Sequence, residues 1–140
     1  MRRFLRGVDR GQEQEAGVKL VIPGTLPGLN QYIEALDKSR HAGAALKKEA
    51  QRTVEWCAKS QLRKFRPTGK VWMKYTWYEP NKRRDKDNTS SFGRKVIKDG
   101  LVKVGVLGND GWRHIEGVSD RFRVDEKQPR VEVEIIEVET

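Results

Sequence analysis

Two aspartates one residue apart, Asp85 and Asp87, stand at the end of a basic run that begins at Asn81. Side chains two positions apart in an extended segment point to the same side, so these carboxylates can share a hard cation. A third candidate ligand, Asp110, follows in a later turn-forming stretch. Oxygen ligands from three carboxylates suit octahedral Mg²⁺, with water in the remaining positions. Beside the cations of the basic run, this pattern favours metal-assisted phosphodiester hydrolysis.

The same residues also describe an ordinary helix cap in a basic loop. Asp, Asn, Thr and Ser cap the first N–H groups of helices, and Asp85 or Asp87 would then only pair with neighbouring cations. The metal interpretation gains weight from the strand predicted before the motif, the helix predicted after it and the third acid at Asp110. Zinc is disfavoured, because His41 and His114 are isolated and lack the spacing of ligands.

The composition points to a polyanionic partner. The 140 residues carry a formal net charge of +9, which favours nucleic acid; an anionic membrane is the rival, and surplus surface lysine is the simplest alternative. Residues 38–84 contain fourteen Lys or Arg against three Glu, whereas residues 109–140 contain nine acidic and five basic residues. A basic half and an acidic half indicate a binding face and a back.

The chain is expected to be a cytoplasmic protein with one folded domain. No apolar run approaches the length of a membrane span, and residues 1–6 lack the apolar core of a signal peptide. The single cysteine, Cys57, excludes an internal disulfide and a cysteine-based zinc site. Residues 1–16 show no apolar periodicity and are expected to form a flexible extension, with the domain at residues 17–140.

Apolar periodicity and turn residues predict the elements that position the acids. Residues 27–30 are expected to form a turn-rich loop, and Gly105 is expected to end the second helix. The predicted elements are a strand at 18–22, a helix at 42–65, a strand at 70–78, a helix from 88 or 89 to 104, and strands at 115–124 and 131–138. This β-α-β-α-β-β order indicates an α+β domain with a mixed β-sheet and helices packed on one side.

Basic side chains near the acids are predicted to contact DNA. On a helical wheel, Arg94, Lys95 and Lys98 lie within about 80° of Asp87, on a predicted exposed face. A cation there would add positive charge where the phosphorus centre gains negative charge. The predicted DNA-binding residues are Lys47, Lys48, Arg52, Lys82, Arg83, Arg84, Arg94 and Lys98.

The run from Arg84 to Asn88, followed by the run from Lys95 to Asp110, resembles the core of the RusA family of phage-type Holliday junction resolvases. The likeness covers roughly residues 18–138 and includes residues 27–30, which resemble an early loop of that family. The resemblance implies a homodimeric endonuclease of DNA recombination and repair, dependent on Mg²⁺ or Mn²⁺, that nicks two opposed strands of a four-way junction. It implies no organic cofactor.

The resemblance also assigns roles. It implies Asp85, Asp87 and Asp110 as metal ligands and catalytic residues, and Lys95 as the catalytic lysine. The family has this lysine four residues after the second aspartate, whereas Lys95 follows eight after Asp87. The residues that could supply the charge instead are Arg94, Lys98, Lys47 and Lys48.

Two other functions remain open from the sequence. One is a non-catalytic, basic module that binds DNA junctions and whose carboxylates only cap a helix. The other is a nuclease that acts on flaps or replication forks, which differs from a resolvase in the shape of its substrate. No residue of the chain separates these alternatives.

Overall fold

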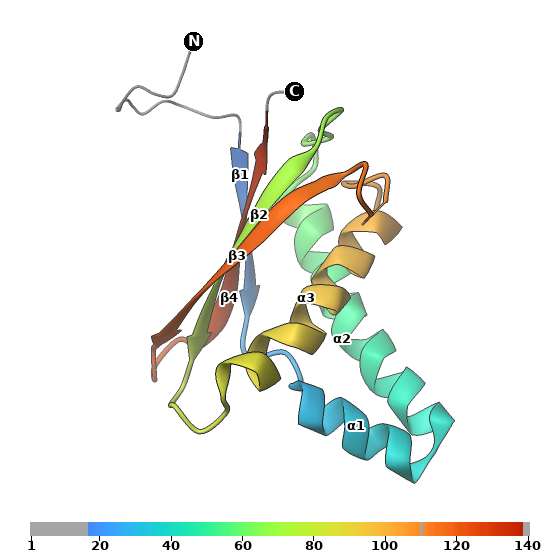
Figure 1. Cartoon of the computed structure of the whole chain (residues 1–140), viewed down its shortest axis with the longest axis vertical. Coiled ribbons are helices and arrows are strands. Elements are labelled where there is room, and N and C mark those ends of the chain that lie inside the picture. Colours follow the sequence, from blue (N-terminus) through green and yellow to red (C-terminus); the bar gives the residue numbers. More distant parts are fainter. Residues whose placement is uncertain (1–16, 110, 139–140) are drawn as a thin grey trace.

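The computed structural model describes residues 17–109 and 111–138. Its elements are β1 (Gly17–Pro23), α1 (Leu29–Lys38), α2 (Arg40–Gln61), β2 (Val71–Glu79), α3 (Lys86–Lys103), β3 (Ile115–Val124) and β4 (Arg130–Glu137). The strands form one sheet in the order β1-β4-β2-β3, and the helices lie on one side of it (Figure 1). The predicted α+β fold with a mixed sheet is confirmed. The predicted extension, residues 1–16, lies outside the described residues.

The sheet is antiparallel except for one pair of strands. β4 pairs antiparallel with both β1 and β2, whereas β2 and β3 are parallel. A parallel pair needs a crossover connection, and α3 provides it. Val71 lies opposite Ile115 and Glu79 opposite Val124, so β2 and β3 begin at one end of the sheet and finish together at the other. The chain therefore enters α3 at the end of the sheet where both strands finish.

The core lies between the sheet and the helices. β2 alternates as predicted, and its side chains at Val71, Met73, Tyr75 and Trp77 are buried. The buried residues of the two long helices are Gly43, Ala50, Val54, Cys57 and Ala58 of α2 and Thr89, Ser90, Phe92, Gly93, Val96, Ile97, Gly100 and Leu101 of α3. α2 and α3 approach closely at Gly100, where an added Cβ would lie 2.8 Å from a methyl carbon of Val54. This close approach packs α3 tightly against α2.

One helix was not predicted. α1 begins at Leu29, inside the loop expected at residues 27–30, so that expectation is wrong for Leu29 and Asn30; Ser39 alone separates α1 from α2. The Ser39 main chain closes α1, while its side chain accepts a hydrogen bond from the Ala42 N–H at 2.9 Å and so caps α2. The observed order is therefore β-α-α-β-α-β-β. The helix predicted at 42–65 begins and ends earlier, at Arg40–Gln61.

The ends of α3 follow from its local sequence. Gly105, with φ of 84°, ends the helix as predicted: its N–H donates to Val102 O, and the Val106 N–H donates to Leu101 O. The start lies two or three residues before the predicted position, because Asp85 acts as the N-cap. Among the helices of the described ranges, none has the length and apolar character to cross a membrane.

Candidate functional site

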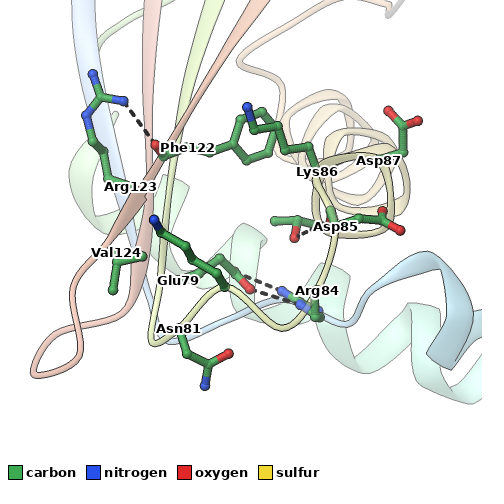
Figure 2. Close-up of a pocket in the computed structure, with 11 residues that line it drawn as sticks. Glu79, Asn81, Arg84, Asp85, Lys86, Asp87, Phe122, Arg123 and Val124 are labelled. Carbon is green, nitrogen blue, oxygen red and sulfur yellow. Dashed lines mark hydrogen bonds and ion pairs between the residues drawn. The ribbon is translucent and has the colours of Figure 1, made fainter.

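A pocket of about 860 Å³ opens where β2 and β3 end (Figure 2). The end of β2, the loop that follows it, the first turn of α3 and the end of β3 form its walls. The residues relevant to its chemistry are Glu79, Asn81, Lys82, Arg84, Asp85, Lys86, Asp87, Phe122 and Arg123. The structure therefore brings the two predicted carboxylates together with cations and an aromatic ring.

Asp85 joins the loop to α3. Its backbone is extended, and its side-chain Oδ1 accepts a hydrogen bond from the Asn88 N–H at 2.7 Å. Its main-chain oxygen accepts from both the N–H and the hydroxyl of Thr89, each at 3.0 Å. Within the described part of the chain, no donor reaches Oδ2. The carboxylate thus caps the helix with one oxygen and has the other open to solvent.

Asp87 lies in the first turn of α3 and is exposed. The prediction that both acids share an extended segment is wrong, because α3 already includes Asp87. Figure 2 nevertheless shows both carboxylates on one side of the start of α3, with Lys86 on the other side. The positive end of the helix dipole favours anionic groups at this position. The two carboxylates offer hard oxygen donors at the start of α3, and Mg²⁺ prefers such donors.

The third predicted ligand, Asp110, lies outside the described residues. Its neighbours Asn109 and Gly111 belong to the connection between α3 and β3, and the Gly111 oxygen accepts from the His114 N–H. The His114 oxygen in turn accepts from the Val71 N–H at 2.9 Å, which places this connection at the start of β2. Asp85 lies beyond the opposite end of that strand. The 18 residues of α3 that separate the two ends span about 27 Å.

The described residues do not form a complete metal site. Among residues 17–109 and 111–138, no three His, Cys, Asp or Glu side chains gather in a group able to hold a metal ion. Asp85 and Asp87 offer two carboxylates, which are fewer oxygen donors than a hard cation takes. The rest would have to come from water, from substrate or from acids outside this set.

Lys95 does not lie at the carboxylate pair. Its Nζ is 3.2 Å from Asp99 Oδ1, and Lys47 Nζ is 2.9 Å from Asp99 Oδ2. Eight residues of helix place Lys95 about 12 Å along the axis from Asp87. Lys47 links α2 to α3 through the same carboxylate. Neither lysine is therefore placed to serve Asp85 and Asp87 within one chain, and their catalytic or DNA-binding roles stay predictions.

Arg84 is half-buried, and protein acceptors bind its guanidinium group. Its Nε and Nη2 donate to the two oxygens of Glu79, each at 2.9 Å, and its Nη1 donates to Leu26 O at 3.0 Å. Such a bidentate pair fixes the plane of the guanidinium. Arg84 thus holds the loop before α3 to the end of β2 and to the chain before α1. Sequence analysis missed Glu79, because only the fold reveals its partner.

Two segments that carry the family resemblance, residues 27–30 and 84–88, meet beside the Arg84–Glu79 ion pair. The Asn88 Oδ1 accepts a hydrogen bond from the Asn30 N–H at 2.8 Å, although 58 residues separate them. A Cβ added at Gly28 would lie 2.8 Å from Asn88 Oδ1 and 2.9 Å from Arg84 Nη1. Residues 27–30 therefore support the first turn of α3, which carries both aspartates.

Arg94 lies beneath α3 and not on its open face. It forms an ion pair with Asp120 of β3, whose other oxygen accepts the indole N–H of Trp77 at 2.8 Å. The prediction that Arg94 shares an exposed face with Asp87 is wrong for its guanidinium group. Sequence analysis missed Asp120, which reaches Arg94 only through the register of β3.

The remaining predicted cations lie at the surface or close to it. Lys82 and Arg83 are exposed on the loop before α3, and Lys48 and Arg52 are exposed on α2. Lys98 is half-buried on α3. Lys82 is exposed and also lines the pocket that Asp85 and Asp87 line.

Comparison with known proteins adds no relative to this picture. None of the protein-family models searched matches the chain, and no curated protein matches it. The function of the site must therefore be argued from its residues and their geometry.

Proposed function

We propose that this protein is a metal-dependent, structure-selective DNA endonuclease that resolves Holliday junctions by paired nicks, as the RusA-like motif suggests. The observation that carries the proposal is the carboxylate pair at the start of α3. Asp85 and Asp87 are exposed there, and they line one pocket with the exposed cations Lys82 and Lys86. Oxygen donors for a hard cation next to donors for phosphate are what metal-assisted phosphodiester hydrolysis requires.

Each group has a distinct task in this proposal. Asp85 and Asp87 would hold Mg²⁺, or Mn²⁺ in its place, and the ion when bound supplies Lewis-acid chemistry to a phosphodiester. Lys82 and Arg83 would hold the flanking phosphates by charge. The Arg84–Glu79 ion pair fixes the loop that carries these groups, so the site is built before DNA binds.

A homodimer completes the proposal. A two-fold dimer suits a four-way junction, because it offers two equal sites to two equivalent strands. It also addresses the third ligand, since the neighbours of Asp110 lie about a helix length from Asp85 within one chain. Asp110, which the family resemblance implies as the third ligand, would come either from the same chain or from the partner subunit. The reaction would take place in the cytoplasm of a bacterial or phage-infected cell.

Cleavage of labelled DNA tests the proposal. The wild type, Asp87→Asn and the matched control Asp37→Asn are incubated in Mg²⁺ with a four-way junction, a flap, a replication fork and a linear duplex. We expect the wild type and the control, altered at an exposed position of α1, to nick the junction in preference to the other substrates. Asp87→Asn should nick none. The proposal fails if the wild type cuts no substrate or if Asp87→Asn cuts as well as the wild type.

Mixed dimers test the origin of the third ligand. Asp87→Asn and Asp110→Asn chains are each expected to be inactive alone. If the site combines two subunits, their mixture forms dimers in which one site keeps all its carboxylates, and single nicks return. If each site lies within one chain, the mixed dimers lose one ligand at each site and stay inactive.

One observation favours a second function. Asp85 accepts the Asn88 N–H as an ordinary N-cap, which is the role expected of it in a non-catalytic junction-binding module. Such a module would bind junctions with steep salt dependence and would not nick them when Mg²⁺ is added. The assay above separates the two functions directly.

A further inference from the structure

The pocket beside the start of α3 has a partly open aromatic floor. Phe122 is half-buried near the end of β3, and Lys86 Nζ lies 5.6 Å from the centroid of its ring. Figure 2 shows Lys86 reaching toward this ring from the side of α3 opposite the two carboxylates. One turn of helix therefore presents acids on one side and, on the other, a cation over an aromatic face.

Residues that carry hydrogen-bond donors also line this pocket. The Asn81 side-chain oxygen accepts the Arg83 N–H at 3.0 Å, so the amide NH₂ group is what Asn81 can offer to a ligand. Lys82 and Arg123 are exposed and also line the pocket. Amide and cationic N–H groups match the carbonyl oxygens and ring nitrogens on the edges of nucleobases. An aromatic floor with donors at its rim is thus suited to a flat ring that carries acceptors.

The size and position of the pocket agree with such an occupant. Its volume of about 860 Å³ lies within the range of pockets that hold small organic ligands. We propose that it receives one unstacked nucleobase of the strand whose phosphate would lie at the start of α3, and that this base stacks on Phe122 in the position over the ring that Lys86 now occupies. The inference rests on the proposed DNA substrate and adds to it a base-binding subsite.

This subsite would favour branched DNA. A base inside a linear duplex must be unstacked and unpaired before it can enter, whereas a base at a branch point loses less on leaving its neighbours. Stacking on an aromatic ring tolerates every base, since each has a π-face. The donors at Asn81 and Lys82 would then favour bases that present acceptors. The pocket therefore selects DNA structure first and sequence second.

Fluorescence of 2-aminopurine, which rises when this base is unstacked from its neighbours in DNA, tests the proposal. The base is placed in turn at each position near the crossover of a four-way junction and at matched positions of a linear duplex. Binding is measured in EDTA, so that no strand is cut. We expect the wild type to raise the fluorescence at one crossover position and at no duplex position.

Four variants assign the effect to the pocket. Phe122→Leu keeps apolar volume but removes the ring, and it should abolish the fluorescence rise and weaken junction binding about tenfold. Phe122→Tyr keeps the ring and should behave as the wild type, while Lys86→Met should reduce the rise. Trp56→Ala removes an aromatic side chain that is 75% exposed on α2 and should change neither readout. Thermal unfolding of each variant confirms that it is folded.

The inference and the proposed function can fail separately. If no position brightens, or if Phe122→Leu and Phe122→Tyr give the same signal, the base-binding subsite is refuted even when junctions are cut. If a crossover base brightens through Phe122 but Mg²⁺ brings no nicking, the subsite stands and belongs to a binding module. Equal brightening in duplex and junction would refute the selection of branched DNA.

Discussion

Asp120 and Asp87 are two carboxylates beside α3 with opposite surroundings. Asp120 lies on the inner face of the sheet, where one oxygen accepts from Trp77 and the other from Arg94, and its side chain is 18% exposed. Asp87 is exposed at the start of the helix, and no donor of the described residues reaches its carboxylate. Protein donors satisfy the first acid, so it serves the fold. The second has open oxygens, so it can bind a ligand.

Glu79 is satisfied by protein donors as Asp120 is, and Asp85 is satisfied only in part. Glu79 is buried and both of its oxygens accept from Arg84, whereas Asp85 is exposed and uses one oxygen to cap α3. If the comparison is sound, removal of Asp120 should cause the largest loss in the free energy of unfolding. The loss should then decrease in the order Glu79, Asp85, Asp87. The expected effect on DNA cleavage runs the other way along the same series.

Asp120→Ala should have the largest effect on stability, a loss of about 3 kcal/mol in the free energy of unfolding. The substitution leaves the Arg94 guanidinium and the Trp77 indole N–H without their common acceptor beneath the helix. Urea unfolding followed by tryptophan fluorescence measures the loss. The control Asp37→Ala, at an exposed position of α1, should cost less than about 0.5 kcal/mol. Equal losses for Asp120→Ala and Asp37→Ala would contradict the inference that Asp120 serves the fold.

Glu79→Gln should lower the free energy of unfolding by about 2 kcal/mol. Glutamine keeps the volume of the side chain but removes the negative charge that the Arg84 guanidinium faces. Because Arg84 also holds Leu26 O, the loop before α3 should loosen, and junction binding should weaken with it. The control Glu34→Gln changes an exposed acid of α1. Unchanged stability would mean that the ion pair does not hold the loop.

Asp85→Ala should cost about 1 kcal/mol, the usual effect of losing an N-cap. Asp85→Asn separates the cap from the charge, because asparagine caps helices as well as aspartate does. The asparagine variant should therefore keep the wild-type stability and yet lose Mg²⁺-dependent cleavage. Urea unfolding and the junction assay measure the two properties on the same preparation. Full cleavage by Asp85→Asn would mean that Asp85 only caps α3.

Elements with strong local signals were predicted well. The alternating apolar residues of β2 predicted its buried face, and β3 has the predicted bounds, Ile115–Val124. α1 was missed because Pro27 and Gly28 indicate a turn, although Tyr32 and Leu36 have helical spacing. The start of α3 was placed late, because several consecutive polar residues can each cap a helix.

The residues of the candidate site also differ in how well the sequence predicts them. Asp85 and Asp87 are neighbours in the sequence, so their proximity could be predicted without a fold. The ion pair of Arg94 with Asp120 depends on the parallel register that sets Tyr75 opposite Asp120, and no periodicity contains that register. The contact of Asn30 with Asn88 likewise depends on tertiary structure. Sequence alone therefore indicated the open acids better than the groups that support them.

Asp87→Asn should have the smallest effect on stability, less than about 0.5 kcal/mol, because its carboxylate is exposed at the helix start. Its effect should emerge only when metal is present. Mg²⁺ or Mn²⁺ should raise the melting temperature of the wild type by a few degrees, since an ion that binds only the folded state stabilises it. The Asp87→Asn variant should show little of this rise.

Sodium chloride at matched ionic strength controls for screening of the basic surface, which every divalent salt also produces. If sodium reproduces the rise, or if Asp87→Asn responds to Mg²⁺ as the wild type does, the open carboxylate binds no metal. The contrast between Asp120 and Asp87 would then describe a structural ion pair and a solvated helix end. In that case the non-catalytic junction-binding module becomes the better account of the chain, because Asp85 would keep only its role as a cap.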